Sequence, residues 1–339
     1  MPQNLVLSAD LPPAMDEFEF IATHLAPLAG PGGLGLKDDA AILKPSSGKD
    51  LILTKDTMVE GVHFPNGHYG GDTAEKLLRV NLSDLAAKGA HPIGYLLSIA
   101  WPKSIDNRYF KGFAAGLSDV QEAYDFKLLG GDTTSIEGPM VVTATLIGDV
   151  PEGQMVTRNG AKAGDDVWVT GTIGDACLGL QTVLGQALKP QPSAEGLWHF
   201  ENAYYRPEPR LLFRKALRQY ATACADISDG LVADAAHIAA ASDVRFILDA
   251  DKVPLSPHSG AWLSAQTDEE NAFKSLITAG DDYELIFTAA PQEASNIRKA
   301  AMAIGLRLAR VGTADAGEGV SVLFDGAEME FDSTGHKHF

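Results

Sequence analysis

Cysteine and long apolar runs are both scarce in this chain of 339 residues. Its two cysteines, Cys177 and Cys224, are far apart and lack metal-ligand spacing, which excludes a disulfide framework and favours a reducing compartment. No apolar stretch approaches the roughly 18 residues that span a bilayer. The first twenty residues carry acidic side chains, Pro12 and Pro13 in place of a basic start and an apolar core. We therefore expect a cytoplasmic protein without a membrane partner.

Basic residues are also in deficit. The chain has 27 Lys and Arg against 45 Asp and Glu, and its formal net charge is −18. This charge argues against nucleic acid or an anionic membrane as the main partner, because both are themselves negative. If such a protein handles phosphates, it needs metal cations between its carboxylates and the ligand.

The length predicts two domains, which we expect at residues 1–150 and 151–339. The boundary is set by a turn-rich stretch at Pro151, Glu152 and Gly153. Strand-like and helix-like patterns alternate in both halves, which predicts a mixed α/β fold. The expected strands are 40–43, 51–54, 94–100, 126–130, 140–147, 167–170, 222–225, 246–248 and 284–288. The expected helices are 72–89 with Asp72 as its N-cap, 106–124, 229–241 and 291–304.

Six short motifs centred on aspartate lie at the expected ends of these elements. They are Lys37-Asp38-Asp39, Thr54-Lys55-Asp56-Thr57, Asn81-Leu82-Ser83-Asp84, Gly130-Gly131-Asp132-Thr133-Thr134, Asp226-Ile227-Ser228-Asp229-Gly230 and Gly280-Asp281-Asp282-Tyr283-Glu284. Each alone is typical of an ordinary turn or helix cap. Converging carboxylates, however, repel one another unless hard cations lie between them, and oxygen ligands suit Mg²⁺. Together the motifs predict a magnesium-dependent enzyme that uses a nucleotide.

The motifs have different expected positions. We expect Asp38 to precede a strand directly, and Asp56 and Asp132 to follow strands, at sheet margins where ligands often bind. Asp84 is expected inside a helix, on the same face as Asn81 and Lys88, so a solvated polar face is the alternative to a ligand site.

Two glycine-rich segments do not predict a nucleotide-binding loop. Gly30 to Gly35 fits the dinucleotide pattern, but a strand is expected to follow it rather than to precede it. Gly48-Lys49-Asp50 lacks both the earlier glycine and the hydroxyl of a P-loop. The nucleotide is therefore expected to be held in another way.

In this order, the motifs resemble the thiamine-monophosphate kinase family, a branch of the aminoimidazole ribonucleotide synthetase-like superfamily. The most specific parts are Asp56 to Phe64, Asn81 to Ala90, Gly130 to Thr134 and Gly280 to Leu285. The resemblance implies a two-domain fold in which an N-terminal mixed sheet dimerises and a C-terminal α/β domain closes the site. It also implies ATP- and Mg²⁺-dependent phosphorylation of thiamine monophosphate to thiamine diphosphate by direct in-line transfer, with ADP as the other product.

The resemblance also implies roles for individual residues. It makes Asp56, Asp84 and Asp132 catalytic, and assigns Mg²⁺ to Asp38, Thr54, Asp56, Asp84, Asp132, Asp226 and Asp229. It places the nucleotide at Gly131, Asp132, Arg158 and Ser228, and the acceptor at His63, Asp281 and His336. An isolated arginine is otherwise a surface ion-pair partner, a lone histidine is otherwise structural, and a terminal residue such as His336 is often frayed.

Four positions depart from the family pattern. Lys37 and Lys55 replace a more usual Gly and Thr, and Asp281 and His336 replace a more usual Glu and aromatic residue. The last two changes lie on the acceptor side. Other superfamily reactions are alternatives, but Cys177 is too late for a selenophosphate synthetase, and the ending His338-Phe339 differs from the terminal Cys of the hydrogenase-maturation protein. A nucleotide-binding regulator without turnover is a further alternative, which the retained carboxylates oppose.

Overall fold

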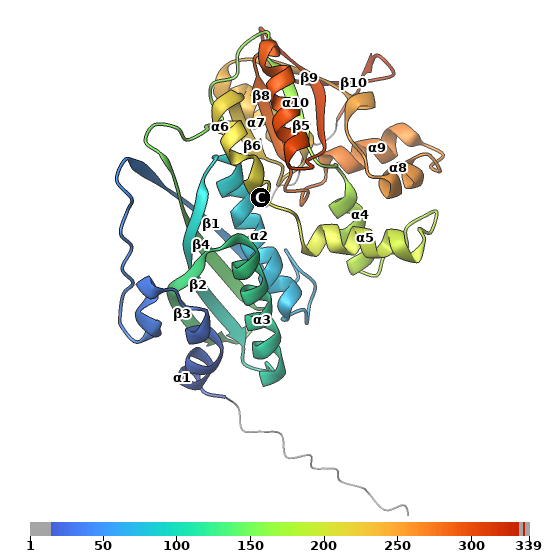
Figure 1. Cartoon of the computed structure of the whole chain (residues 1–339). Helices are drawn as coiled ribbons and strands as arrows, with labels where there is room; N and C mark the ends of the chain where they lie inside the picture. Colours follow the sequence, from blue (N-terminus) through green and yellow to red (C-terminus); the bar gives the residue numbers. More distant parts are fainter. Residues whose placement is uncertain (1–14, 332–334, 336–339) are drawn as a thin grey trace, which may run out of the picture.

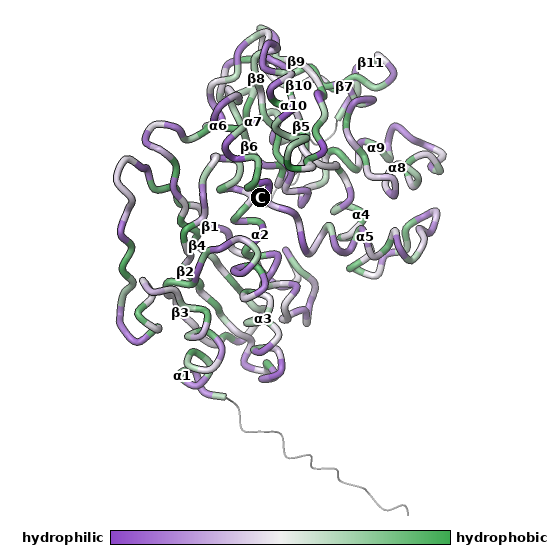
Figure 2. Tube along the Cα trace, viewed as in Figure 1, coloured by the Kyte–Doolittle hydropathy of each residue, from purple (hydrophilic) through white to green (hydrophobic). Residues whose placement is uncertain are grey.

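The structure is a computed structural model that describes residues 15–331 and 335. Its strands form two sheets that share no strand, one of four strands and one of seven (Figure 1). Figure 2 shows apolar stretches along the strands of both sheets and polar ones along the outer loops. No helix in the described part of the chain is long and apolar enough to cross a bilayer.

The first sheet is mixed and has the order β1-β4-β2-β3. Its strands are β1 (Lys49–Val59), β2 (His91–Pro102), β3 (Lys127–Ile136) and β4 (Val141–Pro151). The pair β2 and β3 is parallel, whereas the other neighbours are antiparallel. Helices α2 (Gly71–Ala87) and α3 (Asn107–Tyr124) cover one face, where Leu77 and Leu117 are fully buried in one core with Ile52 and Met58 of β1. Because side chains alternate along a strand, Leu53 and Lys55 lie on the opposite, uncovered face.

The second sheet has the order β11-β10-β7-β9-β5-β8-β6. Its strands are β5 (Asp166–Thr170), β6 (Ala221–Asp226), β7 (Arg245–Asp249), β8 (Leu285–Ala289), β9 (Leu308–Asp315), β10 (Gly319–Phe324) and β11 (Ala327–Glu328). Strands β10 and β7 are parallel, and the remaining pairs are antiparallel. Every residue of β5 and β8 is buried, because helices cover both faces of the sheet.

The helices of this half divide between the two faces. Val167 and Val169 share a core with α7 (Leu231–Ser242) and α9 (Glu269–Thr278), whereas Trp168 shares one with α6 (Arg214–Tyr220) and α10 (Ala294–Ala303). The other helices are α4 (Asp175–Val183), α5 (Ala194–Tyr205) and α8 (Pro257–Leu263), and α1 (Glu17–Phe20) near the start of the chain. Short 3-10 turns are η2 (Ala26–Leu28), η3 (Pro31–Leu36), η4 (Leu211–Phe213), η5 (Ala250–Lys252) and η6 (Pro291–Glu293), and η1 (Ile21–Leu25) is a π-helix.

Several expectations about local structure are wrong. Residues 40–43 form no strand; Ile42 donates its backbone N–H to Gly32 O at 2.8 Å, and the segment lies beside the 3-10 turn η3. Asp38 therefore does not directly precede a strand. The glycine-rich segment from Gly30 to Gly35 is also not followed by the strand expected at residues 40–43. Gly70 occupies the N-cap position of helix α2, and Asp72 is the second residue of the helix, where its carboxylate pairs with Arg206.

The strands that carry the central aspartates are longer than expected. Asp56 lies within β1, opposite Ala144 of β4, and Asp132 lies within β3, opposite Ser98 of β2. Neither residue follows its strand. Both side chains instead project from a position within the strand. Polar residues interrupt the apolar pattern at these positions, so the pattern predicts shorter strands than the structure contains.

Candidate active site

Three carboxylates from three separate elements converge where α2 meets the second domain. Asp56 comes from β1, Asp84 from α2 and Asp226 from the end of β6. Thr54 Oγ1 donates to Asp84 Oδ2 at 2.5 Å, and the backbone N–H of Asp56 donates to Asn81 Oδ1 at 3.1 Å. The tertiary fold thus brings together carboxylates that are up to 170 positions apart in the sequence.

Burial raises the pKa values of these three carboxyl groups. Burial, and then the charge and hydrogen bond of Asp84, raise the pKa of Asp56 to about 7. Burial likewise raises the pKa of Asp84, although the Thr54 hydrogen bond, Lys88 and Arg158 oppose it. Burial and the charges of Asp84 and Asp234 raise the pKa of Asp226 well above its ordinary value. A divalent cation would relieve this repulsion, and the set of carboxylate and hydroxyl oxygens fits Mg²⁺.

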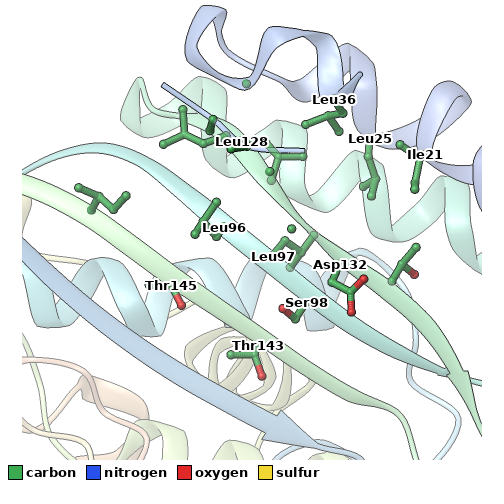
Figure 3. A pocket seen from close by; sticks show the side chains of 18 of the residues that line it. Ile21, Leu25, Leu36, Leu96, Leu97, Ser98, Leu128, Asp132, Thr143 and Thr145 are labelled. Atoms are coloured by element: carbon green, nitrogen blue, oxygen red, sulfur yellow. The ribbon is translucent and has the colours of Figure 1, made fainter. Parts of the chain in front are cut away.

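A second group of predicted residues lines a cavity of about 600 Å³ between the first sheet and the segment that contains η1 and η3 (Figure 3). Asp38, Gly131, Asp132 and Lys55 all line it, beside Thr143 and Thr145 of β4. A Cβ atom at Gly131 would lie 1.8 Å from Leu97 O, so only glycine fits between β3 and β2 here. Asp56, Asp84 and Asp226 are not among the lining residues, so the structure divides the predicted metal ligands into two groups.

The two aspartate motifs of the second domain pair with each other through their backbones. Ile227 donates to Glu284 O at 2.8 Å, and Asp281 donates to Ser228 O at 2.9 Å. A Cβ atom at Gly280 would lie 2.2 Å from Ser228 O, so the approach requires glycine. Ser83 Oγ donates to Tyr283 O at 3.3 Å and joins this paired segment to α2. These bonds fix the segment that carries Ser228 and Asp229, which lie two and three residues after Asp226 in the chain.

Arg158 lies near Asp84 of α2 and near Asp234 of α7. Its charge lowers the pKa of Asp84 and of Asp234, although burial outweighs it at both carboxyls. The Arg158 carbonyl also accepts a hydrogen bond from Ser242 Oγ at 3.1 Å, which ties the 157–160 segment to the end of α7. The guanidinium is therefore placed to meet an anion beside the carboxylates.

His63 and Asp281, the predicted acceptor contacts, are connected by two residues that the sequence motifs do not include. Tyr204 donates its hydroxyl to His63 O at 2.8 Å, and Lys76 Nζ lies 3.3 Å from the centroid of the Tyr204 ring. Lys76 Nζ also forms an ion pair with Asp281 Oδ1 at 3.0 Å. The one signal in the sequence is spacing, since Thr73, Lys76 and Ser83 recur along one face of the helix. His336 lies outside the described residues.

The turn that carries His63 is held by one carboxylate. Glu60 Oε1 accepts from the Gly67 N–H at 2.8 Å and from the Tyr69 hydroxyl at 2.7 Å, and Oε2 accepts from the Met140 N–H at 2.8 Å. Burial raises the pKa of Glu60, but the hydrogen bonds from Met140, Gly67 and Tyr69 outweigh it and lower the pKa. Glu60 therefore acts as an anionic anchor for the turn.

Comparisons with known proteins cover both domains. Residues 37–150 match the family described as AIR synthase related protein, N-terminal domain, and residues 162–325 match the corresponding C-terminal domain. The chain is 44% identical over 324 residues to the thiamine-monophosphate kinase of Caulobacter vibrioides, an alignment that spans 95% of this chain and 90% of that protein.

Solved structures are similar over the same extent. The crystal structure of thiamine-monophosphate kinase from Stenotrophomonas maltophilia K279a gives a TM-score of 0.77 at 37% identity and covers 87% of this chain and 91% of that one. The structure of AaThiL complexed with AMPPCP and TMP gives a TM-score of 0.76 at 30% identity and covers 96% of this chain and 97% of that one.

Proposed function

Since this chain belongs to the thiamine-monophosphate kinase family, we propose that it transfers the terminal phosphoryl group of ATP to the phosphate of thiamine monophosphate. The products are thiamine diphosphate and ADP, and the reaction depends on Mg²⁺. The observation that carries the proposal is the convergence of the half-buried Asp56 and Asp84 with the buried Asp226, beside Arg158. The relative solved with AMPPCP and TMP supports the choice of the two substrates.

The metal ligands in this proposal are the oxygen donors of both groups. They are Asp38, Thr54, Asp56, Asp84, Asp132, Asp226 and Asp229. Bound Mg²⁺ supplies charge neutralisation at the phosphates and a template that orients them. In phosphoryl transfer, positioning and electrostatic stabilisation supply nearly all of the catalysis, so Asp56, Asp84 and Asp132 act by holding charge and geometry rather than as nucleophiles.

Substrate contacts follow from the same arrangement. Gly131, Asp132, Arg158 and Ser228 bind the nucleotide, with the planar guanidinium suited to a phosphate. On the acceptor side, the imidazole of His63 faces the phosphate, and Asp281 offsets the positive charge of the thiazolium ring. His336 is proposed as a further acceptor contact, although it lies outside the described residues.

The assembly and domain division are also proposals. We place the domains at residues 1–150 and 151–339, in the cytoplasm. A homodimer formed by the first sheets is supported by the uncovered face of that sheet, where Leu53 and Leu96 are 66% and 40% exposed. Light scattering with size-exclusion chromatography tests this assembly: a single species at the monomer mass would contradict it.

The test of the activity is product formation by purified protein with ATP, Mg²⁺ and thiamine monophosphate. We expect ADP and thiamine diphosphate in equal amounts, and neither product when EDTA removes the metal. Binding of Mg-ATP without either product would refute the kinase proposal and favour a regulator. ADP formation without thiamine diphosphate would direct the search to another phosphate acceptor.

A further inference from the structure

A buried carboxylate oxygen of the second domain has no hydrogen-bond partner among residues 15–331 and 335. This atom is Oδ1 of Asp234, a residue of α7 that is 1% exposed. The other oxygen, Oδ2, accepts the backbone N–H groups of Ser228 at 2.9 Å and Asp229 at 3.0 Å. An unpaired buried oxygen on a charged group is costly, and in a folded protein it commonly marks a bound ion or water.

Two further ligand groups lie beside the Asp234 carboxylate. A carboxylate oxygen of Asp229, a carboxylate oxygen of Asp234 and a ring nitrogen of His237 all lie within 4.8 Å of one another. Asp234 and His237 are three residues apart on α7 and therefore share a face of the helix. Carboxylate and histidine at this spacing on a helix form a recurrent pair of ligands for transition metals.

The position at the beginning of α7 is compatible with a cation. The N-terminal end of a helix ordinarily disfavours positive charge, because its free N–H groups point outward. Here Asp234 Oδ2 accepts the N–H groups of Ser228 and Asp229, just ahead of the helix, and leaves Oδ1 free. Two carboxylates and one imidazole then surround the position.

We propose that Asp229, Asp234 and His237 form a transition-metal site distinct from the Mg²⁺ ligands around Asp56 and Asp84. The imidazole decides the class of cation, because nitrogen ligands suit Zn²⁺ and related ions whereas Mg²⁺ selects oxygen. Three protein ligands leave a position open, and the exposed side of His237 admits water to it. Asp229 is shared with the proposed Mg²⁺ set, so His237 is the residue that separates the two sites.

The bound cation would tie the Asp226–Gly230 turn to the first turns of α7. That turn carries Ser228, and its backbone pairs with the segment that carries Asp281. The site would therefore stabilise the second domain at the edge of the candidate active site. This inference does not depend on the proposed kinase activity, because the site is defined by ligands and not by turnover.

The test is calorimetric titration of metal-stripped, full-length protein with ZnCl₂, without substrates. We expect wild-type protein to bind one Zn²⁺ that His237→Ala binds at least about 10-fold more weakly, as expected when a ligand is lost. His91→Ala is the matched control, because His91 is also exposed and lies at the start of β2 in the other domain. Zinc bound elsewhere on the chain cancels in this comparison.

Asp234→Asn provides a second variant with the same expected loss, although it also weakens the cap on Ser228 and Asp229. Its folding is checked by circular dichroism, and His237→Ala remains decisive because that side chain is exposed. As a separate readout, Zn²⁺ should raise the thermal midpoint of the wild type and of His91→Ala but not of His237→Ala. Equal zinc affinity in wild type and His237→Ala would overturn the proposal.

Discussion

Lys76 of α2 and Asp281 of the second domain form an ion pair across the two domains, with Nζ 3.0 Å from Oδ1. The two partners are unequal, because the Lys76 side chain is 2% exposed whereas that of Asp281 is 28% exposed. Burial lowers the pKa of Lys76, and the charge of Asp281 opposes this shift. The buried ammonium thus depends on a carboxylate that itself reaches solvent.

This asymmetry predicts that Asp281→Asn destabilises the protein more than Lys76→Met. The asparagine variant leaves a buried ammonium without its counter-charge, and we expect a loss of about 1–3 kcal/mol, below the range for a fully buried pair because solvent screens Asp281. The methionine variant leaves a carboxylate that water can solvate. Urea unfolding of both variants, with the exposed Asp251→Asn as control, measures the difference; a larger loss for Lys76→Met would contradict it.

The raised pKa of Asp56 predicts how the stability of metal-free protein depends on pH. The pKa of Asp56 is 3.8 in its ordinary state and about 7 in the folded protein. Between these two pH values the folded protein retains a proton on Asp56 that the unfolded chain has released. The free energy of unfolding therefore falls as pH rises through this window. We expect wild type to lose stability relative to Asp56→Asn from pH 4 to about 7 when unfolded by urea in EDTA. A difference between the two proteins that stays constant with pH would refute the shift.

Loss of one carboxylate from either group should abolish turnover without unfolding the chain. We expect Asp56→Asn and Asp132→Asn to lower the rate of ADP formation by at least about 100-fold, because bound metals supply several kcal/mol of transition-state stabilisation. Asp119→Asn is the control, since Asp119 is an exposed aspartate on α3. Unchanged ADP production in both folded variants would sink the assignment of metal ligands.

Glu60 should affect acceptor binding through the turn that carries His63. Glu60→Gln replaces an oxygen that accepts hydrogen bonds with an amide that donates, and we expect a loss of stability of about 1–3 kcal/mol. The KM for thiamine monophosphate should rise while the KM for ATP changes little. Tyr69→Phe removes only one of the three hydrogen bonds and should have the smaller effect. An equal rise in both KM values would show that the turn has no specific role on the acceptor side.

Much of the candidate site could be predicted from the sequence, because its chemistry depends on residues that are neighbours in the chain. Carboxylates beside glycine and hydroxyl residues indicated metal and phosphate binding, and the structure places Asp56, Asp84 and Asp226 together. The apolar spacing of α2 also predicted its extent to within two residues at each end. The strand expected at residues 40–43 does not form: this apolar run lies beside the 3-10 turn η3, and Ile42 is 56% exposed.

Other features follow from contacts between distant segments. By itself, the sequence determined the class of chemistry, the family and the alternation of strands and helices, since these depend on residue type and short spacing. Only the tertiary structure decided that Lys76 is buried against Tyr204 and Asp281, and that one oxygen of Asp234 has no partner within the described residues. The physical reason is that burial and pairing depend on which surfaces of the two domains meet, and residues more than a hundred positions apart supply those surfaces.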